Sequence, residues 1–388
     1  MMKTEGRYKM LWLGTLFLLT VLTLCVGCSS DEPEVEPKLN IYVYAPERAS
    51  VTRGESIPTE EEAKIHNLQI WVFRSSDPSK MVASLTLTTE EELEGLNNNK
   101  SATYSISLAD RSYAEKPEPV DIYVLANVIG NNGTNYLEDV NTGQDLEEAV
   151  FNGGDFFRFL KSSESYQAAN GIPAGGVPMS GVARGKSVID KNNVLHVNEA
   201  NLKLVRTVSK IRFVFSSLDG TQLFVDHISL NENMMYKKVR FFLDGDHPDY
   251  WVEGDPFNKE VLLLKGDRVN PVAQNTDPTH YAYSSSMTDG DYEDLVNTGV
   301  NDQALTEFVP VYLPESDKRL SGTITYRLTS GGSPMTASFS MATGNFRRNQ
   351  TWIVYAYYIG SSKLDVNTVK VVDWEEDPDL PDHEVPNW

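Results

Sequence analysis

The chain has 388 residues, which is enough for one large domain or two smaller ones, and we expect two. Its formal net charge of −21 at pH 7 makes the surface strongly acidic. Such a surface repels the phosphate backbone of nucleic acids, so nucleic-acid binding is disfavoured. Hydrophobic residues make up 40% of the chain and include 18 Tyr and 15 Phe, so the composition supports a packed core.

The N-terminus has the pattern of an export signal. Lys3, Arg7 and Lys9 precede an apolar and small-residue run over residues 11–27. That run is shorter than the about 20 apolar residues of a membrane-spanning helix, and threonines interrupt it. The sequence therefore predicts a signal peptide over residues 1–27.

The signal ends at Cys28, and this region resembles the bacterial lipobox, in which a cysteine after a small residue is acylated and becomes the mature N-terminus. Cys25 stands where that pattern has an aliphatic residue, and an ordinary secretory signal is the alternative. Residues 28–38 are predicted to be a lipidated acidic tether, similar to the surface-export tag of Bacteroidetes lipoproteins. Because both cysteines lie here, an exported protein has no disulfide and depends on its core.

A strand pattern and a long polar loop follow the tether. Residues 39–44 alternate, with Leu39, Ile41 and Val43 on one face, which predicts a half-buried strand. Residues 47–64 are polar and acidic and contain Arg48 and Arg53. Loops of this length tend to be functional, and exposed arginines are natural sites for trypsin-like cleavage.

Strand patterns then recur along the rest of the chain. We predict a short acidic helix over residues 89–96, one or two helices over residues 142–161, and a glycine- and proline-rich loop over residues 171–181. The predicted strands span residues 65–73, 81–88, 102–108, 120–128, 194–197, 202–205, 209–215, 223–231, 239–243, 261–264, 307–313, 322–328, 335–341, 352–359 and 366–374. Many short strands at this spacing predict an all-β protein of the sandwich or barrel type, with a few short helices.

Catalytic motifs are missing from this pattern. The six histidines are scattered, no Gly-x-Ser-x-Gly motif occurs, and residues 181–187 imitate a phosphate-binding loop except that Ser180 replaces its first glycine. The acidic clusters at residues 244–249 and 289–294 could bind calcium, but they lack the EF-hand pattern, and solvated loop acid is the simpler interpretation. We predict a protein that is not an enzyme and has no cofactor or metal site.

Seven segments, taken in order, resemble the fimbrillin lipoproteins of the Bacteroidetes, the FimA/Mfa-like fimbrial subunits. Each segment is short, and their shared order along the chain makes the resemblance specific. They are residues 65–73, 123–127, 177–181, 202–211, 311–315, 346–352 and 369–374.

The resemblance implies two transthyretin-like antiparallel β-sandwich domains, at residues 39–198 and 199–388, the second with an acidic, proline-rich tail. It implies a structural or adhesive subunit of cell-surface fimbriae, exported to the cell outer membrane as a surface-exposed lipoprotein. The implied partners are other fimbrial subunits, in a homo- or hetero-polymer, and outer-membrane lipid through acylated Cys28. Stalk, tip and anchor roles stay open, and so does the host or bacterial ligand.

The resemblance also implies a mode of assembly. An arginine-specific protease would cut the loop after the first strand, and a strand of a neighbouring subunit would replace the one lost. The displaced strand carries Leu39, Ile41 and Val43, and the cut would follow Arg53, with Arg48 as the second choice. The alternative is that both arginines only moderate the charge of an acidic loop.

The replacing strand is harder to assign. The candidate donor strand carries Val369, Val371, Trp374, Val385 and Trp388. Three prolines interrupt the tail after residue 374, and proline cannot donate to a strand ladder. A donor over residues 366–374 and an anchor or tip role are therefore both open.

The rival interpretation is a surface glycan-binding lipoprotein of a polysaccharide-uptake system. It requires exposed, coplanar tryptophans in loops on one face, with the first strand left intact. Trp71 and Trp352 lie inside apolar strand patterns, which favours their burial.

Overall fold

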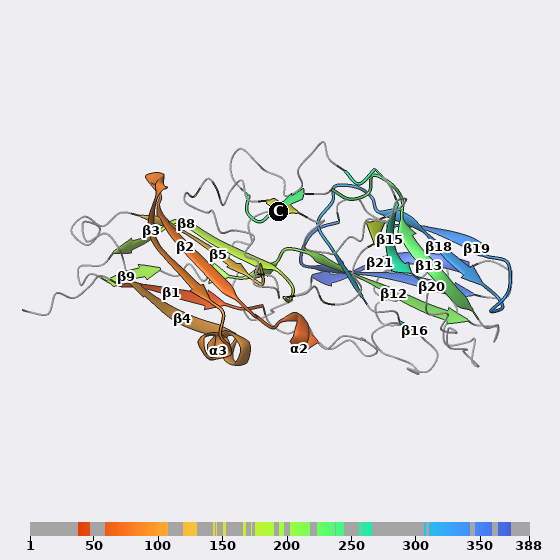
Figure 1. The fold of residues 1–388 in the computed structure, drawn as a ribbon, viewed down its shortest axis with the longest axis horizontal. Helices are drawn as coiled ribbons and strands as arrows, with labels where there is room; N and C mark the ends of the chain where they lie inside the picture. Colours follow the sequence, from red (N-terminus) through yellow and green to blue (C-terminus); the bar gives the residue numbers. More distant parts are fainter. Residues whose placement is uncertain are drawn as a thin grey trace, which may run out of the picture. The chain divides into compact units, whose positions relative to one another are not determined.

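The fold of the chain is given by a computed structural model (Figure 1). The structure divides after Pro37, and every residue that it describes lies in the unit that begins at Lys38. The described residues are 38–46, 59–107, 119–129, 143, 145, 150–152, 166–167, 172, 175–189, 194–197, 202–217, 223–236, 238–243, 256–258, 260–265, 306–307, 310–341, 346–358 and 364–373.

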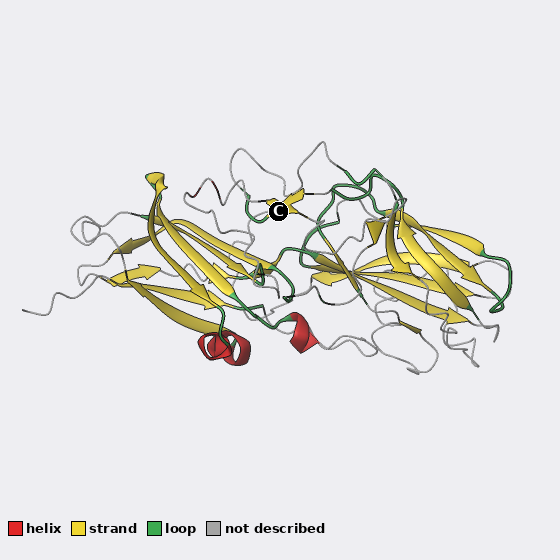
Figure 2. Cartoon of the chain, in the orientation of Figure 1, coloured by secondary structure: helices red, strands yellow, loops and turns green. Residues whose placement is uncertain are grey.

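Strands dominate these residues, which confirms the predicted all-β class (Figure 2). Two short helices are described over their full length, α2 (Thr59–Glu62) and α3 (Glu90–Asn99), and residues 143 and 145 are also helical. The hydrophobic residues alternate with polar ones along many strands, so that one face of a sheet packs inward and the other meets water.

A nine-stranded sheet contains the first strand of the chain. Its main path runs β10-β1-β9-β8-β5-β2-β3, with β4 paired to β1 and β11 paired to β8. Its strands are β1 (Lys38–Tyr44), β2 (Leu68–Arg74), β3 (Asp77–Leu87), β4 (Ser101–Ser107), β5 (Val120–Ala126), β8 (Met179–Ile189), β9 (Val194–Val197), β10 (Leu202–Lys203) and β11 (Val205–Arg206).

Two five-stranded sheets pack against each other as a β-sandwich. The ring of Phe213 in one sheet meets the ring of Phe339 in the other edge-on, with centroids 5.8 Å apart. One sheet has the path β16-β12-β20-β21 with β17 on β12, and the other has the order β19-β18-β13-β15-β7. The strands are β7 (Tyr166–Gln167), β12 (Ser209–Ser217), β13 (Phe224–Leu230), β15 (Val261–Lys265), β16 (Thr306–Glu307), β17 (Val311–Leu313), β18 (Ser321–Arg327), β19 (Met335–Ser340), β20 (Gln350–Tyr358) and β21 (Leu364–Asp373).

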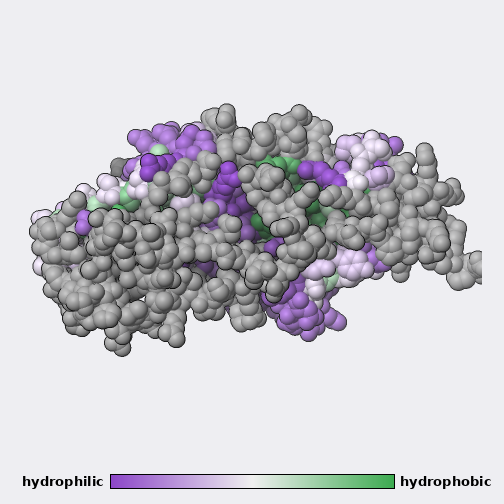
Figure 3. Space-filling view, turned by 180° about the vertical axis from the view of Figure 1, so that it is seen from behind, coloured by the Kyte–Doolittle hydropathy of each residue, from purple (hydrophilic) through white to green (hydrophobic). Residues whose placement is uncertain are grey.

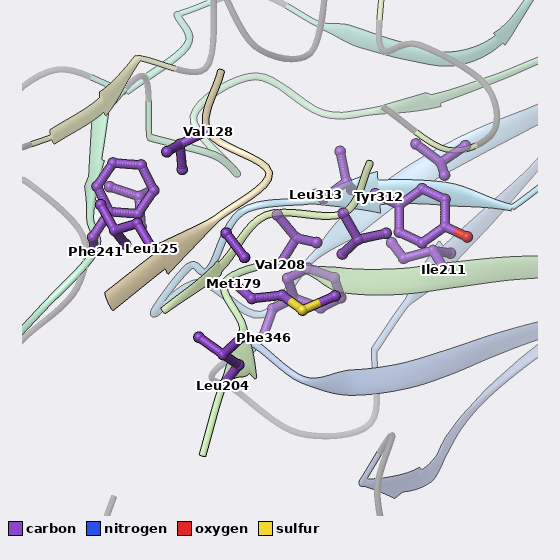
Figure 4. Packing of buried hydrophobic residues seen from close by; sticks show 14 of the residues in the cluster. Leu125, Val128, Met179, Leu204, Val208, Ile211, Phe241, Tyr312, Leu313 and Phe346 are labelled. Atoms are coloured by element: carbon purple, nitrogen blue, oxygen red, sulfur yellow. The ribbon is translucent and has the colours of Figure 1, made fainter. Parts of the chain in front are cut away.

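One continuous hydrophobic cluster joins these sheets. Met179 of β8 lies beside Val208 and Phe346, and Leu125 of β5 lies beside Phe241 (Figure 4). Segments far apart in sequence therefore share one core.

The predicted domain boundary at residues 198 and 199 stays a prediction, and so does the likeness to transthyretin. β10 and β11 follow residue 198 and pair with β1 and β8, so the nine-stranded sheet extends past that position. β7 precedes residue 198 and pairs with β15 in a five-stranded sheet.

Several elements differ from the sequence predictions, and three of these differences have a clear local cause. β2 begins at Leu68 instead of residue 65, because asparagine side chains bind the backbone of Ile65 and His66 in place of a neighbouring strand. The helix prediction for residues 142–161 is wrong at β6 (Val150–Asn152), which pairs with β14 (Lys238–Arg240). This long-range pairing overrides the local helical pattern.

The third difference concerns the segment that imitates a phosphate-binding loop. Residues 181–187 lie inside the long strand β8, part of which was predicted as a loop. A side chain at Gly181 would come within 2.9 Å of the carbonyl oxygen of Lys203, and Gly185 has φ +59° opposite a register shift in β5. These glycines serve close strand packing and a bulge.

Hydrophilic residues occupy most of the described surface on the face in Figure 3, and hydrophobic ones form small patches. No helix in the described part of the chain is long and apolar enough to cross a membrane. The same residues contain no cluster of three or more potential metal ligands.

Helix α3 begins with a capping box. The backbone N–H of Glu92 donates to the Thr89 hydroxyl (3.4 Å), and the backbone N–H of Thr89 donates to the Glu92 carboxylate (3.1 Å). The Thr89 hydroxyl also donates to this carboxylate, and this hydrogen bond lowers the pKa of Glu92. The helix buries Leu93 and Leu96 in the core.

Because the cap satisfies backbone donors at the first turn of α3, we expect Thr89→Ala to lower the free energy of unfolding by about 1 kcal/mol. Urea denaturation measures the change. Ser333→Ala, at an exposed loop position, is the control and should leave the midpoint unchanged. Equal midpoints for the two variants would contradict the capping role.

Candidate functional site

The first strand lies in the interior of its sheet, although it comes first in the chain. All seven residues of β1 pair antiparallel with β4, from Lys38 opposite Ser107 to Tyr44 opposite Ser101. The other edge of β1 pairs in parallel with two short strands, β9 through residues 38–40 and β10 through residues 43–44. We call the place between β4 and these two strands the β1 position.

The chain beyond β1 extends this pairing by two backbone hydrogen bonds. The N–H of Leu204 donates to the carbonyl of Tyr44 (2.9 Å), and the N–H of Ala45 donates to the carbonyl of Lys100 (2.9 Å). β1 is thus held along both edges by backbone hydrogen bonds to segments that follow it by about 60 to 160 positions in the sequence.

The two faces of β1 differ sharply. Leu39, Ile41 and Val43 are fully buried, whereas Tyr42 is 41% exposed and Tyr44 is 37% exposed. This confirms the alternation predicted from the sequence. Full burial of each of the three aliphatic side chains stabilises the fold by roughly 1.5–3 kcal/mol.

β4 provides the matching side chains. The inward residues of β4 lie directly opposite those of β1: Ile106 opposite Leu39, Tyr104 opposite Ile41, and Ala102 opposite Val43. All three residues of β4 belong to the core cluster or pack against it. On the outer face β4 has only Ser and Thr residues, and Ser105 donates a hydrogen bond to the side-chain oxygen of Asn40.

Tyr104 of β4 lies directly opposite Ile41, the central buried residue of β1. Its hydroxyl donates to the backbone carbonyl of Glu92 in α3 (3.4 Å). Burial, with a smaller contribution from the charge of Glu92, raises the pKa of Tyr104 to about 12. The Tyr104 phenol therefore loses its proton less readily than an exposed tyrosine does.

The remaining predicted site residues have different positions. Cys28, Arg48, Arg53, Trp374, Val385 and Trp388 lie outside the described residues, as do the two acidic clusters considered for calcium. Val369 and Val371 lie in β21, where they pair with Ile353 and Thr351 of β20. The structure thus places two donor candidates in the subunit's own sheet.

Two tryptophans bear on the glycan-binding alternative. Trp71 in β2 and Trp352 in β20 are both buried. Their burial agrees with the sequence prediction, so neither can offer an exposed surface for stacking a sugar ring.

The partners of β1 were missed by sequence analysis. Residues 102–108, 194–197 and 202–205 were predicted as strands, but their pairing with β1 was not. The identical alternation in β1 and β4 was a usable signal, since two strands with one buried face each can pair. A parallel partner more than 150 residues away leaves no such local signal.

Comparison with known families assigns the chain. Residues 38–233, just over half of the chain, match the family model of the major fimbrial subunit protein, FimA. The chain belongs to this family. It is a structural, adhesive subunit of cell-surface fimbriae and assembles with other fimbrial subunits, and the glycan-uptake alternative is not favoured.

Solved structures of fimbrial proteins resemble the chain more distantly. The tip fimbrial protein Mfa3 from Porphyromonas gingivalis, with a C-terminal truncation, has 16% identity and a TM-score of 0.47, over 85% of this chain and 99% of that one. A fimbrial assembly protein from Parabacteroides distasonis has 11% identity and a TM-score of 0.46, over 88% and 98%. The assignment depends on the family match alone. No curated protein sequence matches the chain.

The two faces of β1 generate a direct test. Ile41→Ala leaves a cavity opposite Tyr104, so we expect it to lower the free energy of unfolding by about 2–5 kcal/mol. Tyr42→Ala, one residue away on the exposed face, is the matched control and should cost much less. Urea denaturation compares them, and a Tyr42 variant that is as unstable as the Ile41 variant would contradict the inward orientation.

Proposed function

We propose that this fimbrial subunit assembles by strand exchange, in which β1 is released by proteolysis and a strand of a neighbouring subunit takes the β1 position. The supporting observation is that β1 is an interior strand with three buried side chains, and that only residues 45–58 connect it to α2. After a cut in that connection, non-covalent contacts alone would hold β1.

The empty β1 position would be a strong acceptor for an extended peptide. Removing β1 leaves backbone groups unpaired along all of β4 and along β9 and β10. It also uncovers the inward side chains Ala102, Tyr104 and Ile106. An incoming strand would restore the backbone hydrogen bonds, and apolar residues at alternate positions would restore the buried face and set the register.

Arg53 is the proposed cleavage site, with Arg48 as the second choice. Gly54 follows Arg53 and permits the extended backbone that proteases bind, whereas Arg48 lies two residues after Pro46. The proposed partner is an arginine-specific protease. Delivery to it would depend on acylation of Cys28 and on display of the subunit as a lipoprotein at the outer membrane surface.

The proposed donor strand lies near the C-terminus and carries Val369, Val371, Trp374, Val385 and Trp388. β21 pairs with β20 along its whole length, from Leu364 opposite Tyr358 to Asp373 opposite Gln350. A donor that includes Val369 and Val371 must therefore leave β20 before it can enter a neighbour, which makes donation and acceptance two separate steps.

Substitution of both loop arginines tests the trigger. We expect Arg48→Lys with Arg53→Lys to abolish polymerisation, because lysine keeps the charge but is not a substrate for an arginine-specific protease. The denaturant-resistant polymer on a gel is the measurement, together with the N-terminal sequence of sheared fimbriae, expected at Gly54 or Ala49.

The same pair of residues changed to alanine removes the charge as well, and we expect the same loss of polymer. Normal polymer from the double-lysine variant, with none from the double-alanine variant, would show that charge and not cleavage matters. If all subunits in sheared fimbriae had an unprocessed N-terminus, cleavage in this loop could not be the trigger of assembly.

Loss of β1 should also change the titration of Tyr104. In the intact subunit burial holds its pKa at about 12, so departure of β1 should bring the pKa down toward the ordinary value of 10. NMR of carbon-13-labelled tyrosine follows the titration in intact and cut protein, and Tyr104→Phe identifies the signal. An unchanged pKa after release of β1 would contradict the proposed exposure of the β1 position.

A further inference from the structure

A buried ion pair holds the chain at Glu62, nine residues after the proposed cut at Arg53. The carboxylate of Glu62, at the end of α2, is fully buried. Both of its oxygens accept hydrogen bonds from the ammonium group of Lys210, at 3.1 Å each, and one also accepts from the hydroxyl of Tyr312. Lys210 is only 2% exposed.

This ion pair ties α2 to a different sheet from that of β1. Lys210 lies in β12 and Tyr312 in β17, directly opposite each other in the ladder of a five-stranded sheet. Both are therefore positioned by strands that make no backbone pairing with β1. Taking a carboxylate and an ammonium out of water is costly unless they are paired, so separation of Glu62 from Lys210 is strongly disfavoured.

Two asparagine side chains bind the backbone between Glu62 and β2. Asn97 accepts from the N–H of Ile65 (2.8 Å) and donates to its carbonyl (3.0 Å). Asn127 accepts from the N–H of His66 (2.8 Å) and donates to the carbonyls of Lys64 (2.9 Å) and Val177 (2.8 Å). None of these hydrogen bonds involves a residue of β1.

The two sides of the connection between β1 and α2 thus have separate attachments. On the N-terminal side the backbone is bound to β4, β9, β10 and Leu204, and on the C-terminal side residues 62–66 are bound by Lys210, Tyr312, Asn97 and Asn127.

From this arrangement we infer that Glu62 is a positioning residue for strand exchange. Paired with Lys210 and Tyr312, it holds the new N-terminal segment in place after the cut, so that β1 alone departs and β2 and the core behind the β1 position stay folded for the incoming strand. This inference rests on the proposed function and adds the requirement that the acceptor be preserved while it is empty.

The test uses the full-length subunit with a site for a sequence-specific protease built into residues 47–58, so that it does not depend on which arginine is cut naturally. The probe is a fluorescent synthetic peptide with the sequence of residues 38–46. We expect the cut protein to take up the peptide and the uncut protein to refuse it. Hydrogen exchange reports whether residues 62–72 stay protected.

Glu62→Gln should leave the uncut protein folded, because β1 and the connection still restrain the segment. After the cut we expect residues 62–72 to lose protection and the affinity for the peptide to fall by about tenfold or more. Glu62→Gln with Lys210→Met removes both charges, which avoids an unpaired buried ammonium. This double variant should show the same defect, and it replaces the single variant in the test if the single variant does not fold.

Glu315→Gln is the matched control. Glu315 forms another buried ion pair, with Arg348 at 3.0 Å, and Arg348 also donates to the backbone carbonyls of Arg240 and Phe241. This variant should lower general stability but bind the peptide as the unsubstituted cut protein does.

Three results would overturn the inference. Equal peptide affinity in the cut Glu62 variants and the cut unsubstituted protein would remove the role of Glu62. An equal loss of peptide affinity in the cut Glu315 variant would show that Glu62 contributes only to general stability. If the cut unsubstituted protein takes up no peptide, strand exchange itself fails, and the inference fails with it.

Discussion

The structure depends on the pairing of β1 along both of its edges. An interior strand is normally a permanent part of a core, because its removal breaks two ladders and uncovers buried side chains. Here the strand is the first described element of the chain, and a polar connection with two arginines follows it. The same contacts that stabilise the subunit therefore define what would be uncovered if β1 left.

The proposed strand exchange would let a fimbrial subunit be stable alone and still enter a polymer. With β1 in place no edge is open at the β1 position, which prevents uncontrolled sheet addition. Under the proposed strand exchange, release of β1 would make the pairing that the subunit loses available to a neighbour. The buried ion pair of Glu62 with Lys210 would then separate the strand that leaves from the segment that stays.

Local sequence patterns predicted the elements better than their partners. The alternation of Leu39, Ile41 and Val43 sufficed to predict β1 and its buried face, and the acidic stretch at residues 89–96 sufficed to predict a helix where α3 lies. The parallel pairing of β1 with β9 and β10 could not be predicted, because it joins distant segments whose patterns fit several partners. The burial of Glu62 could not be predicted either, because its position in an acidic stretch suggests exposure. Its partners Lys210 and Tyr312, which explain the burial, are distant in sequence.

The central claim is that another subunit supplies the strand between β4 and β9 in the fimbria. Electron cryo-microscopy of sheared fimbriae, at a resolution that shows side chains, tests it most directly. The account predicts that the strand at the β1 position continues into a neighbouring subunit and that residues 38–44 of the subunit's own chain are absent. Density for Leu39, Ile41 and Val43 in that place, in every subunit of the polymer, would contradict it.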